Sequence, residues 1–406
     1  MSERVPLVTR LAGSPHGGRF ASLEGYRGLA ALSVVVYHTR GNFHPLVTGS
    51  ADVVDNLGNV GVAVFFLLSG FLLYLPVSRA LFRRTEEPAV GHFLLRRFVR
   101  IYPAFWLALL GWALVIEDAA RKQVKPWKIF LLVDGGLHGL GVAWTLVIEV
   151  WFYIVVAGLS VVLPKLARRC KARRGVLHLQ LGLLSGMWVV AYAYRWWATA
   201  ELHRWNLYSN WVFSYLDWFA YGMVMAVGVA WVESGGALPK SVKGLADRAV
   251  WCFLLAAGTY LTGLVMLVNH PSGAHPESRM SYLYRNGVHG IVALLVLLPA
   301  TLGDREQSSQ RWLRRPTLAA LGTVSYGVYL WHTVIIRYLR VHGPSGSGFW
   351  WLMENLLITV AVTLVIATLS YRLVERPLLN LVPSPSGRDP SPPAPPMVPA
   401  PEVAVG

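Results

Sequence analysis

Two residues able to do chemistry lie within one apolar stretch near the N-terminus. Arg27 and His38 belong to "LEGYRGLAALSVVVYHTR", residues 23–40. Their spacing of eleven positions is about 20° past three full helical turns and about 16 Å along a helix axis. Both side chains therefore share one face of a predicted helix, where ionisable residues are costly and functional by default. The alternatives are a membrane-anchoring Arg27 and a merely interfacial His38.

A group of arginines opens a later apolar segment, "FLLRRFVRIYPAFW". Arg96, Arg97 and Arg100 lie on adjacent helical positions, and Arg97 and Arg100 precede the apolar part. Guanidinium groups make paired, charge-assisted contacts to phosphate, so such a group beside Arg27 suits a polyanionic ligand. The alternative is a basic cluster that only orients the helix in the membrane.

A carboxylate lies well inside the segment "VAWTLVIEVWFYIVV". Thr145, Glu149 and Tyr153 are four positions apart and share a helical stripe. A buried carboxylate needs a partner, and a histidine or an arginine is the obvious candidate. Glu149 is thus either a functional acid or half of an ion pair between helices.

The segment "LGTVSYGVYLWHTV" places Ser325, Tyr329 and His332 on one face of another predicted helix. His332 is either a catalytic histidine or a buried histidine with its hydrogen bonds satisfied. In "GVAVFFLLSGFLL", by contrast, the small residues Ser69 and Gly70 favour close helix packing. Ser69 would act as a nucleophile only with a base in hydrogen-bond reach.

The composition shows which elements must position these residues. Apolar residues make up 54% of the 406 residues, charged residues only 14%, and the mean hydropathy is +0.46. A soluble chain has about 25% charged residues, so the composition indicates an integral membrane protein. The net charge of +16 resides in short basic segments between apolar ones, which is typical of membrane topology and not of nucleic-acid binding. The two cysteines suggest neither a disulfide nor a metal site.

The apolar runs predict an all-α bundle of about ten membrane helices, because each crossing needs about 20 apolar residues. The predicted spans lie near 24–39, 58–77, 98–116, 142–163, 176–195, 211–232, 249–268, 286–302, 318–338 and 350–371. Residues 127–134 are too few to cross and are expected to be interfacial or re-entrant.

The basic connections place both termini in the cytoplasm. We expect a cytoplasmic tail over 1–22, a membrane domain over 23–380 and a disordered Pro-rich tail over 381–406. No removable signal peptide is expected, and we expect a multi-pass protein of an inner or plasma membrane.

The motifs together resemble the acyltransferase-3 family of bacterial membrane O-acyltransferases. The resemblance rests on "LEGYRGLAALSVVVYH", "FFLLSGFLL", "RRFVRIYP", "WTLVIEVWFY", "SYGVYLWH" and "YRLVERPL", in that order, and covers about residues 20–380. It implies a core of ten helices and transfer of an acyl group, acetyl being expected, from acyl-CoA to a hydroxyl. Acyl-CoA would be a co-substrate, and neither a tightly bound cofactor nor a metal is expected.

The resemblance also implies roles for individual residues. The matching positions are Arg27, His38, Arg97, Arg100, Glu149 and His332. The arginines would bind the donor, His38 would act as general base, and Glu149 would orient or stabilise its imidazole. Tyr153, Tyr329 or His332 would donate to the oxyanion, and Ser325 is a further candidate contact. Family members often carry an acidic residue before "FF", where this chain has Ala63 and Val64, and a second glutamate where it has Val150.

The acceptor stays open at this point. A carbohydrate or glycolipid of the cell surface is the first expectation, and a sugar on a macrolide-type metabolite is the second. A transporter or flippase for a glycolipid is the alternative from another class, and a purely structural membrane protein is a third. The acyl chain length and the oligomeric state are not predicted.

Overall fold

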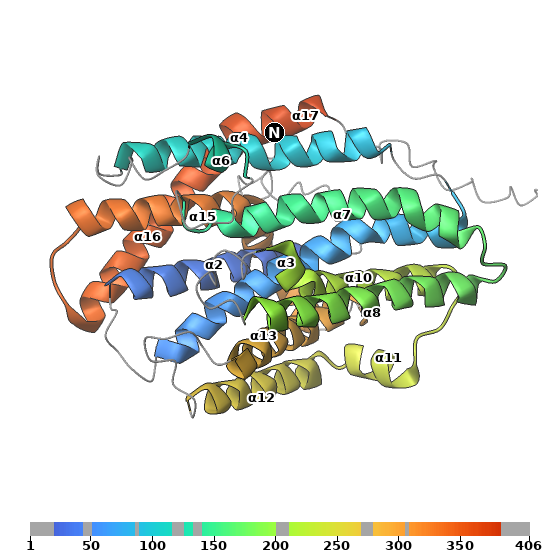
Figure 1. Cartoon of the computed structure of the whole chain (residues 1–406). Helices are drawn as coiled ribbons and strands as arrows, with labels where there is room; N and C mark the ends of the chain where they lie inside the picture. The colour runs from blue at the N-terminus through green and yellow to red at the C-terminus, as the bar shows by residue number, and fades with distance from the viewer. Residues whose placement is uncertain are drawn as a thin grey trace, which may run out of the picture.

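The computed structural model describes residues 20–43, 51–85, 89–115, 126–132, 140–199, 211–268, 279–304 and 308–382. These residues form helices and no strand (Figure 1). The elements, in chain order, are α2 (Ser22–Phe43), α3 (Ala51–Arg83), α4 (Val90–Val115), α6 (Pro126–Phe130), α7 (Ala143–Ala167), α8 (Arg173–Ala198), η2 (Val212–Tyr215), α10 (Leu216–Glu233), α11 (Lys240–Ala246), α12 (Ala249–Val268), α13 (Arg279–Thr301), α14 (Ser308–Leu313), α15 (Pro316–His342), α16 (Gly348–Ser370), η3 (Tyr371–Glu375) and α17 (Arg376–Leu381).

The predicted membrane bundle is confirmed, since the described residues include eight helices long and apolar enough to cross a bilayer. A ninth crossing is formed if α11 and α12, which meet at a bend of 91°, make one span. Each of the ten predicted segments is helical. The span expected near 286–302 is longer than predicted, because α13 already begins at Arg279. Within residues 127–132, the described part of the stretch predicted not to cross, the structure has the short helix α6.

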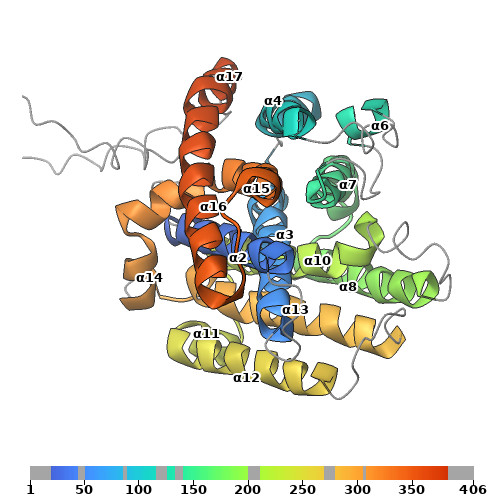
Figure 2. The same ribbon diagram turned by 90° about the vertical axis from the view of Figure 1, so that its left-hand side faces the viewer.

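The first predicted span departs from expectation. α2 is long enough to cross a bilayer but is not among the helices that are apolar enough. It contains Glu24, Arg27, His38 and Arg40. α2 lies near the middle of the bundle, packed against α3 and α15 (Figure 2). Its polar residues are therefore surrounded by protein, where charged groups within a membrane protein are normally found.

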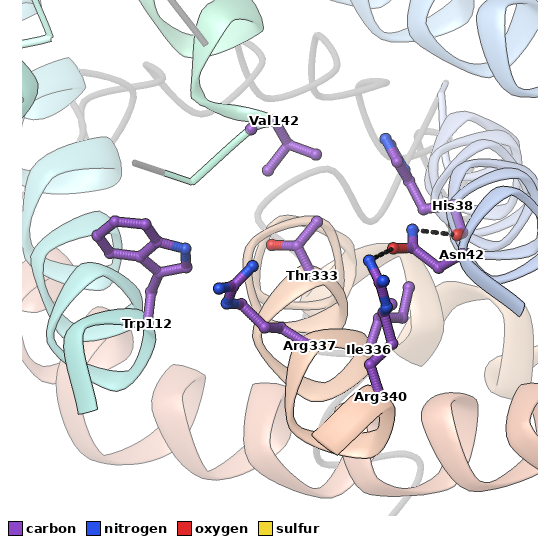
Figure 3. A pocket seen from close by; sticks show the side chains of 9 residues that line it. His38, Asn42, Trp112, Val142, Thr333, Ile336, Arg337 and Arg340 are labelled. Carbon is purple, nitrogen blue, oxygen red and sulfur yellow. Dashed lines mark hydrogen bonds between the residues drawn. The ribbon is translucent and has the colours of Figure 1, made fainter. Parts of the chain in front are cut away.

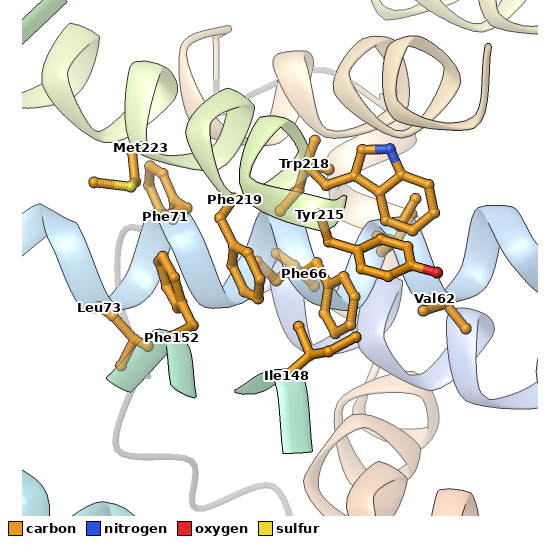
Figure 4. Packing of buried hydrophobic residues seen from close by; sticks show 14 of the residues in the cluster. Val62, Phe66, Phe71, Leu73, Ile148, Phe152, Tyr215, Trp218, Phe219 and Met223 are labelled. Atoms are coloured by element: carbon orange, nitrogen blue, oxygen red, sulfur yellow. The ribbon is translucent and has the colours of Figure 1, made fainter. Parts of the chain in front are cut away.

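Close packing of α3 against α10 forms the centre of the molecule. Gly70 on α3 lies so near the Phe219 backbone that a Cβ atom would collide with its carbonyl group. Beside this contact, Phe152 of α7 stacks on Phe219 with ring centroids 3.7 Å apart, and Phe66 stacks on the same ring at 4.8 Å (Figure 4). The small residues predicted for close packing thus hold α3, α7 and α10 together.

Four helices meet around the functional residues: α2, α4, α7 and α15. Tyr326 of α15 donates a hydrogen bond to the Ile101 carbonyl of α4 at 2.8 Å. Tyr329 of α15 bonds the Thr145 hydroxyl of α7 at 2.8 Å. These contacts determine how the helices are aligned along their axes, and so which polar residues can meet. The predicted tails, apart from residues 20–22 and 381–382, and residues 133–134 lie outside the described residues.

Candidate active site

Two histidines from opposite parts of the sequence form a pair. His38 on α2 and His332 on α15 lie with Nδ1 of His38 3.1 Å from Nε2 of His332. His332 is fully buried, whereas His38 is half-buried. Each Nδ1 also lies 3.1 Å from a carbonyl oxygen one turn earlier, that of Val34 for His38 and that of Val328 for His332.

These contacts determine where the protons lie on the neutral pair. A carbonyl oxygen only accepts, so Nδ1 of His332 carries a proton and donates it to Val328. The Nε2 of His332 is then an acceptor, and the Nδ1 proton of His38 is shared between it and the Val34 carbonyl. The Nε2 of His38, which has no hydrogen-bond partner among the described residues, keeps its lone pair. A histidine held in this tautomer by its other nitrogen can act as a general base.

A cavity of about 270 Å³ adjoins His38. Figure 3 shows the space from close by, with side chains reaching it from α2, α4 and α15 and from the start of α7. The lining residues are His38, Asn42, Trp112, Gly141, Val142, Thr333, Ile336, Arg337 and Arg340. We call this end of the bundle the pocket end, and the end at which Arg27 lies the Arg27 end. The cavity gives a small substrate direct access to the imidazole.

Glu149 is the centre of a second polar group, on α7. Its Oε1 accepts hydrogen bonds from Tyr153 at 2.6 Å and from Ser69 of α3 at 3.2 Å. The guanidinium carbon of Arg97 lies 5.7 Å from the centre of the Tyr153 ring. The buried Nε of Arg97 has no hydrogen-bond partner within the described ranges. Glu149 therefore links α3 and α7 next to an arginine with a free donor.

The predicted contact of Glu149 with His38 is not formed between the described residues. His332 occupies that role, because it receives the Nδ1 proton of His38. Tyr329 of α15 forms a hydrogen bond with Thr145, which lies one turn before Glu149 on α7. This contact identifies the part of α7 that packs against α15 near the histidines. Glu149 faces Ser69 and Tyr153 instead. A role for Glu149 in the reaction thus stays a prediction.

The arginines at the Arg27 end meet carboxylates. Arg27 lies 3.7 Å from Glu24 on the same helix. Arg100 interacts electrostatically with Glu24 and with Glu375, and Glu375 interacts with Arg27 as well. Arg100 and Arg97 also lie near each other and near Tyr153. The structure therefore brings the three predicted donor-binding arginines into one group, from α2 and α4.

The two tyrosines among the other predicted contacts already form hydrogen bonds within the helix bundle. The Tyr329 hydroxyl lies 2.8 Å from the Thr145 hydroxyl and donates to the Val142 carbonyl at 3.2 Å. The Tyr153 proton goes to Glu149. Ser325 is fully buried, its hydroxyl has no hydrogen-bond partner among the residues that the structure describes, and it does not line the cavity. A tyrosine hydroxyl that stabilises the oxyanion would have to give up its present hydrogen bond. Otherwise the hydroxyl that donates to the oxyanion belongs to another residue.

Several residues of these sites were not predicted. Glu375 belongs to the quoted motif "YRLVERPL", and it ends the π-helical turn η3, a distortion frequent at functional sites. In the cavity, Arg337 and Arg340 follow His332 on the same helix. At 100° per residue, five and eight positions place Arg337 about 140° and Arg340 about 80° around the helix from His332, so the stripe of His332 did not point to them. No local signal marks Trp112 or Asn42.

The chain matches a protein family over residues 20–373, by a model described as an acyltransferase domain. It is similar to the peptidoglycan O-acetyltransferase OatA of Listeria monocytogenes, at 24% identity over 88% of this chain and 55% of that protein. It is similar to the putative membrane-bound transacylase BcsY of Komagataeibacter xylinus, at 25% identity over 88% of this chain and 82% of that protein. The acyltransferase MdmB of Streptomyces mycarofaciens is 25% identical, over 91% and 94% of the two chains. No solved structure matches.

The chain spans about half the length of the first of these relatives. The family match, however, extends from the start of α2 to the η3 turn and so includes both histidines, Glu149 and the arginine group. The resemblance seen in the ordered motifs is confirmed, and the chain belongs to this family of membrane acyltransferases.

Proposed function

We propose that this protein transfers an acyl group, acetyl in the first instance, from acyl-CoA to a hydroxyl of a carbohydrate or glycolipid. The observation that supports it best is the His38–His332 pair beside a cavity, with the free lone pair on Nε2 of His38. Acyl transfer from a thioester to an alcohol needs a base that takes up the hydroxyl proton. It needs no further group covalently attached to the protein.

One histidine can carry out both proton transfers of the reaction. Nε2 of His38 takes the proton of the acceptor hydroxyl while its oxygen attacks the thioester carbonyl carbon. The tetrahedral intermediate then collapses, the carbon–sulfur bond breaks, and the leaving sulfur takes the proton back from His38. The products are an ester and free coenzyme A. His332 accepts the Nδ1 hydrogen bond throughout, which stabilises the imidazolium form of His38.

The donor would enter at the Arg27 end, which the basic connections place in the cytoplasm. Each guanidinium group has five N–H donors, so Arg27 and Arg100 keep donors for phosphate although carboxylates lie beside them. Arg97 contributes its free Nε. From there to His38 the helix α2 rises about 16 Å. The pantetheine arm would run along this polar face and bring the thioester to the imidazole.

The acceptor would enter at the pocket end, on the other side of the membrane. OatA is by name a peptidoglycan O-acetyltransferase. A cell-surface polysaccharide or lipid-linked glycan fits such an entry, and plasma-membrane location follows from it. MdmB is named only as an acyltransferase, without a substrate. Its match extends over 91% of this chain and 94% of MdmB.

The test of the proposal is the release of free coenzyme A from acetyl-CoA by the purified protein in detergent, with a panel of oligosaccharide acceptors. We expect thiol release that depends on the acceptor, with the acetylated sugar detected by mass spectrometry. A transporter would show activity only across a sealed membrane. Substrate movement in vesicles by folded protein that never releases thiol would overturn the proposal.

A donor-site variant gives a sharper prediction. Replacing Arg97 by glutamine should raise the KM for acetyl-CoA by about tenfold or more, because a hydrogen bond to a charged group contributes about 1.5–3 kcal/mol. With acetyl-pantetheine, which lacks the nucleotide phosphates, wild type and variant should have the same KM. Steady-state kinetics with both donors measure this difference.

The matched control is Arg83→Gln, which removes an exposed arginine at the end of α3. It should leave both KM values unchanged. An Arg97→Gln variant that loses equally with both donors would mean that Arg97 supports the Tyr153–Glu149 group and does not bind phosphate.

A further inference from the structure

We propose that the cavity at the pocket end is a subsite for an anionic acceptor: a sugar that carries a carboxylate or a phosphate close to the hydroxyl that is acylated. This inference rests on the proposed function and names its substrate class. It starts from Arg337 and Arg340, which line the cavity together with His38.

The two arginines are three positions apart on α15, so they lie on one face of the helix. Figure 3 shows the Arg337 side chain pointing into the space between Trp112 and His38. The Nε of Arg337 is buried and has no hydrogen-bond partner in the part of the chain that the structure describes. Arg340 is exposed, and its Nη1 donates to Oδ1 of Asn42 at 3.4 Å.

The positive charge of this cavity is not balanced by its lining. The described residues around it include two arginines and no carboxylate. Within the part of the chain that the structure describes, neither arginine forms an ion pair. This differs from the Arg27 end, where Arg27 and Arg100 lie beside Glu24 and Glu375. A half-buried guanidinium without a counter-charge is costly, and an anionic ligand would remove that cost.

The remaining lining residues suit a sugar. Trp112 of α4 presents its indole to the cavity opposite α2, and an aromatic face provides apolar area for the ring of a sugar. Thr333 supplies a hydroxyl one turn before Arg337. The volume of about 270 Å³ lies just below the range of about 300–1,000 Å³ that is usual for small-molecule sites, and it suits a single ring.

The position of the arginines relative to the base determines where the anion lies on the acceptor. Asn42 donates to the His38 carbonyl at 2.7 Å and accepts from Arg340, so the base and the arginines are held together at the end of α2. Both His38 and Arg337 face the same one-ring cavity. The charged group is therefore on the acylated residue itself or on its immediate neighbour. Guanidinium binds carboxylate and phosphate alike by paired hydrogen bonds.

Binding and turnover of matched acceptors test this inference. The carboxylate pair is a galacturonic acid oligomer and its methyl ester, and the phosphate pair is lactose 1-phosphate and lactose. Affinities are measured by thermophoresis of the purified full chain in detergent, and turnover is measured by thiol release from acetyl-CoA. The variants are Arg337→Gln and Arg337→Lys, with Arg248→Gln, an exposed arginine outside the cavity, as matched control.

Wild type should bind at least one anion about tenfold or more tightly than its neutral match. Arg337→Gln should abolish that preference and leave the affinity for the neutral match unchanged. Arg337→Lys keeps the charge but loses the paired geometry, so it should retain part of the preference for the anion. The control Arg248→Gln should retain all of that preference. The pair that responds identifies carboxylate or phosphate as the anion.

Equal affinity for charged and neutral acceptors, no saturable binding of either anion, or a preference that survives Arg337→Gln would overturn the inference. A loss of turnover by Arg337→Gln that is equal for charged and neutral acceptors would assign Arg337 to the oxyanion instead, and would overturn it too. Acyl transfer to neutral acceptors that ignores Arg337 would leave the proposed function standing without this subsite. Anion binding that depends on Arg337, without any thiol release, would support this subsite and contradict the proposed function.

Discussion

Replacing His38 by alanine is expected to lower kcat for acyl transfer by about 10²–10⁴-fold, the usual contribution of a positioned general base. His38 lines the cavity, and no other titratable side chain that accepts a proton at neutral pH lines it among the described residues. The KM for acetyl-CoA should change little, since the proposed phosphate contacts lie at the Arg27 end. Initial rates of thiol release at saturating donor measure the effect.

His332 should behave differently, because it is a positioning residue that touches His38 and not the substrate. Replacing His332 by leucine removes the acceptor for the Nδ1 proton and should lower kcat by less than the loss of His38 does. Glutamine, whose amide oxygen can accept the same hydrogen bond, should restore part of the rate. A purely structural role would not predict this rescue.

The matched control for both positions is His342→Ala, an exposed histidine at the end of α15 that does not line the cavity. It should have wild-type rates. A folded His38→Ala protein that keeps more than about a tenth of the wild-type kcat, against the loss expected of a general base, would show that the base lies elsewhere.

Replacing Asp217 by alanine is expected to have the largest effect on stability, a loss of about 3–5 kcal/mol in the free energy of unfolding. Asp217 of α10 and Arg195 of α8 are both fully buried, and Nη1 of Arg195 donates to Oδ2 of Asp217 at 2.9 Å. Arg195 also donates through Nε to the Ser214 carbonyl at 2.6 Å. Without the carboxylate, a guanidinium charge is left buried and unbalanced.

Denaturant titrations in detergent measure this loss, and a double variant separates its causes. Arg195→Met together with Asp217→Leu should recover most of the stability, because two apolar residues of similar size replace the buried pair. The exposed pair Lys243–Asp247 is the comparison, and Asp247→Ala should cost less than about 1 kcal/mol. A single Asp217→Ala variant as stable as wild type would mean that water or another group reaches Arg195.

Predictions that depend on neighbours along one helix agree with the structure. The apolar runs predicted ten helical segments, and all ten are helices, because a run of apolar residues needs only its own backbone hydrogen bonds to be stable in lipid. Likewise, Arg27 and His38 do lie on one helix, and Glu149 and Tyr153 do bond one turn apart. The order of the motifs was enough to indicate the family.

The sequence did not determine which helices pack against one another, or how those helices are aligned along their axes. The partner of His38 is 294 positions away, and the contact depends on the alignment of α2 with α15. A shift of one turn, about 5.4 Å, would have replaced His332 by another residue of the same stripe. The sequence therefore suggested Glu149 as the partner of His38 and gave His332 a separate role, as a catalytic residue or a donor to the oxyanion.

The tertiary structure alone also decided the surroundings of the site. α2 is too polar to be an ordinary lipid-facing span, and its polar residues are tolerated because α3 and α15 surround it. The cavity combines Trp112, Thr333 and Arg337 from two helices with His38 from a third. By itself, the sequence determined the membrane class, the helices and the residues able to do chemistry, since these follow from local composition and spacing. Which of those residues act on one another follows from helix packing, which side chains far apart in the sequence decide together.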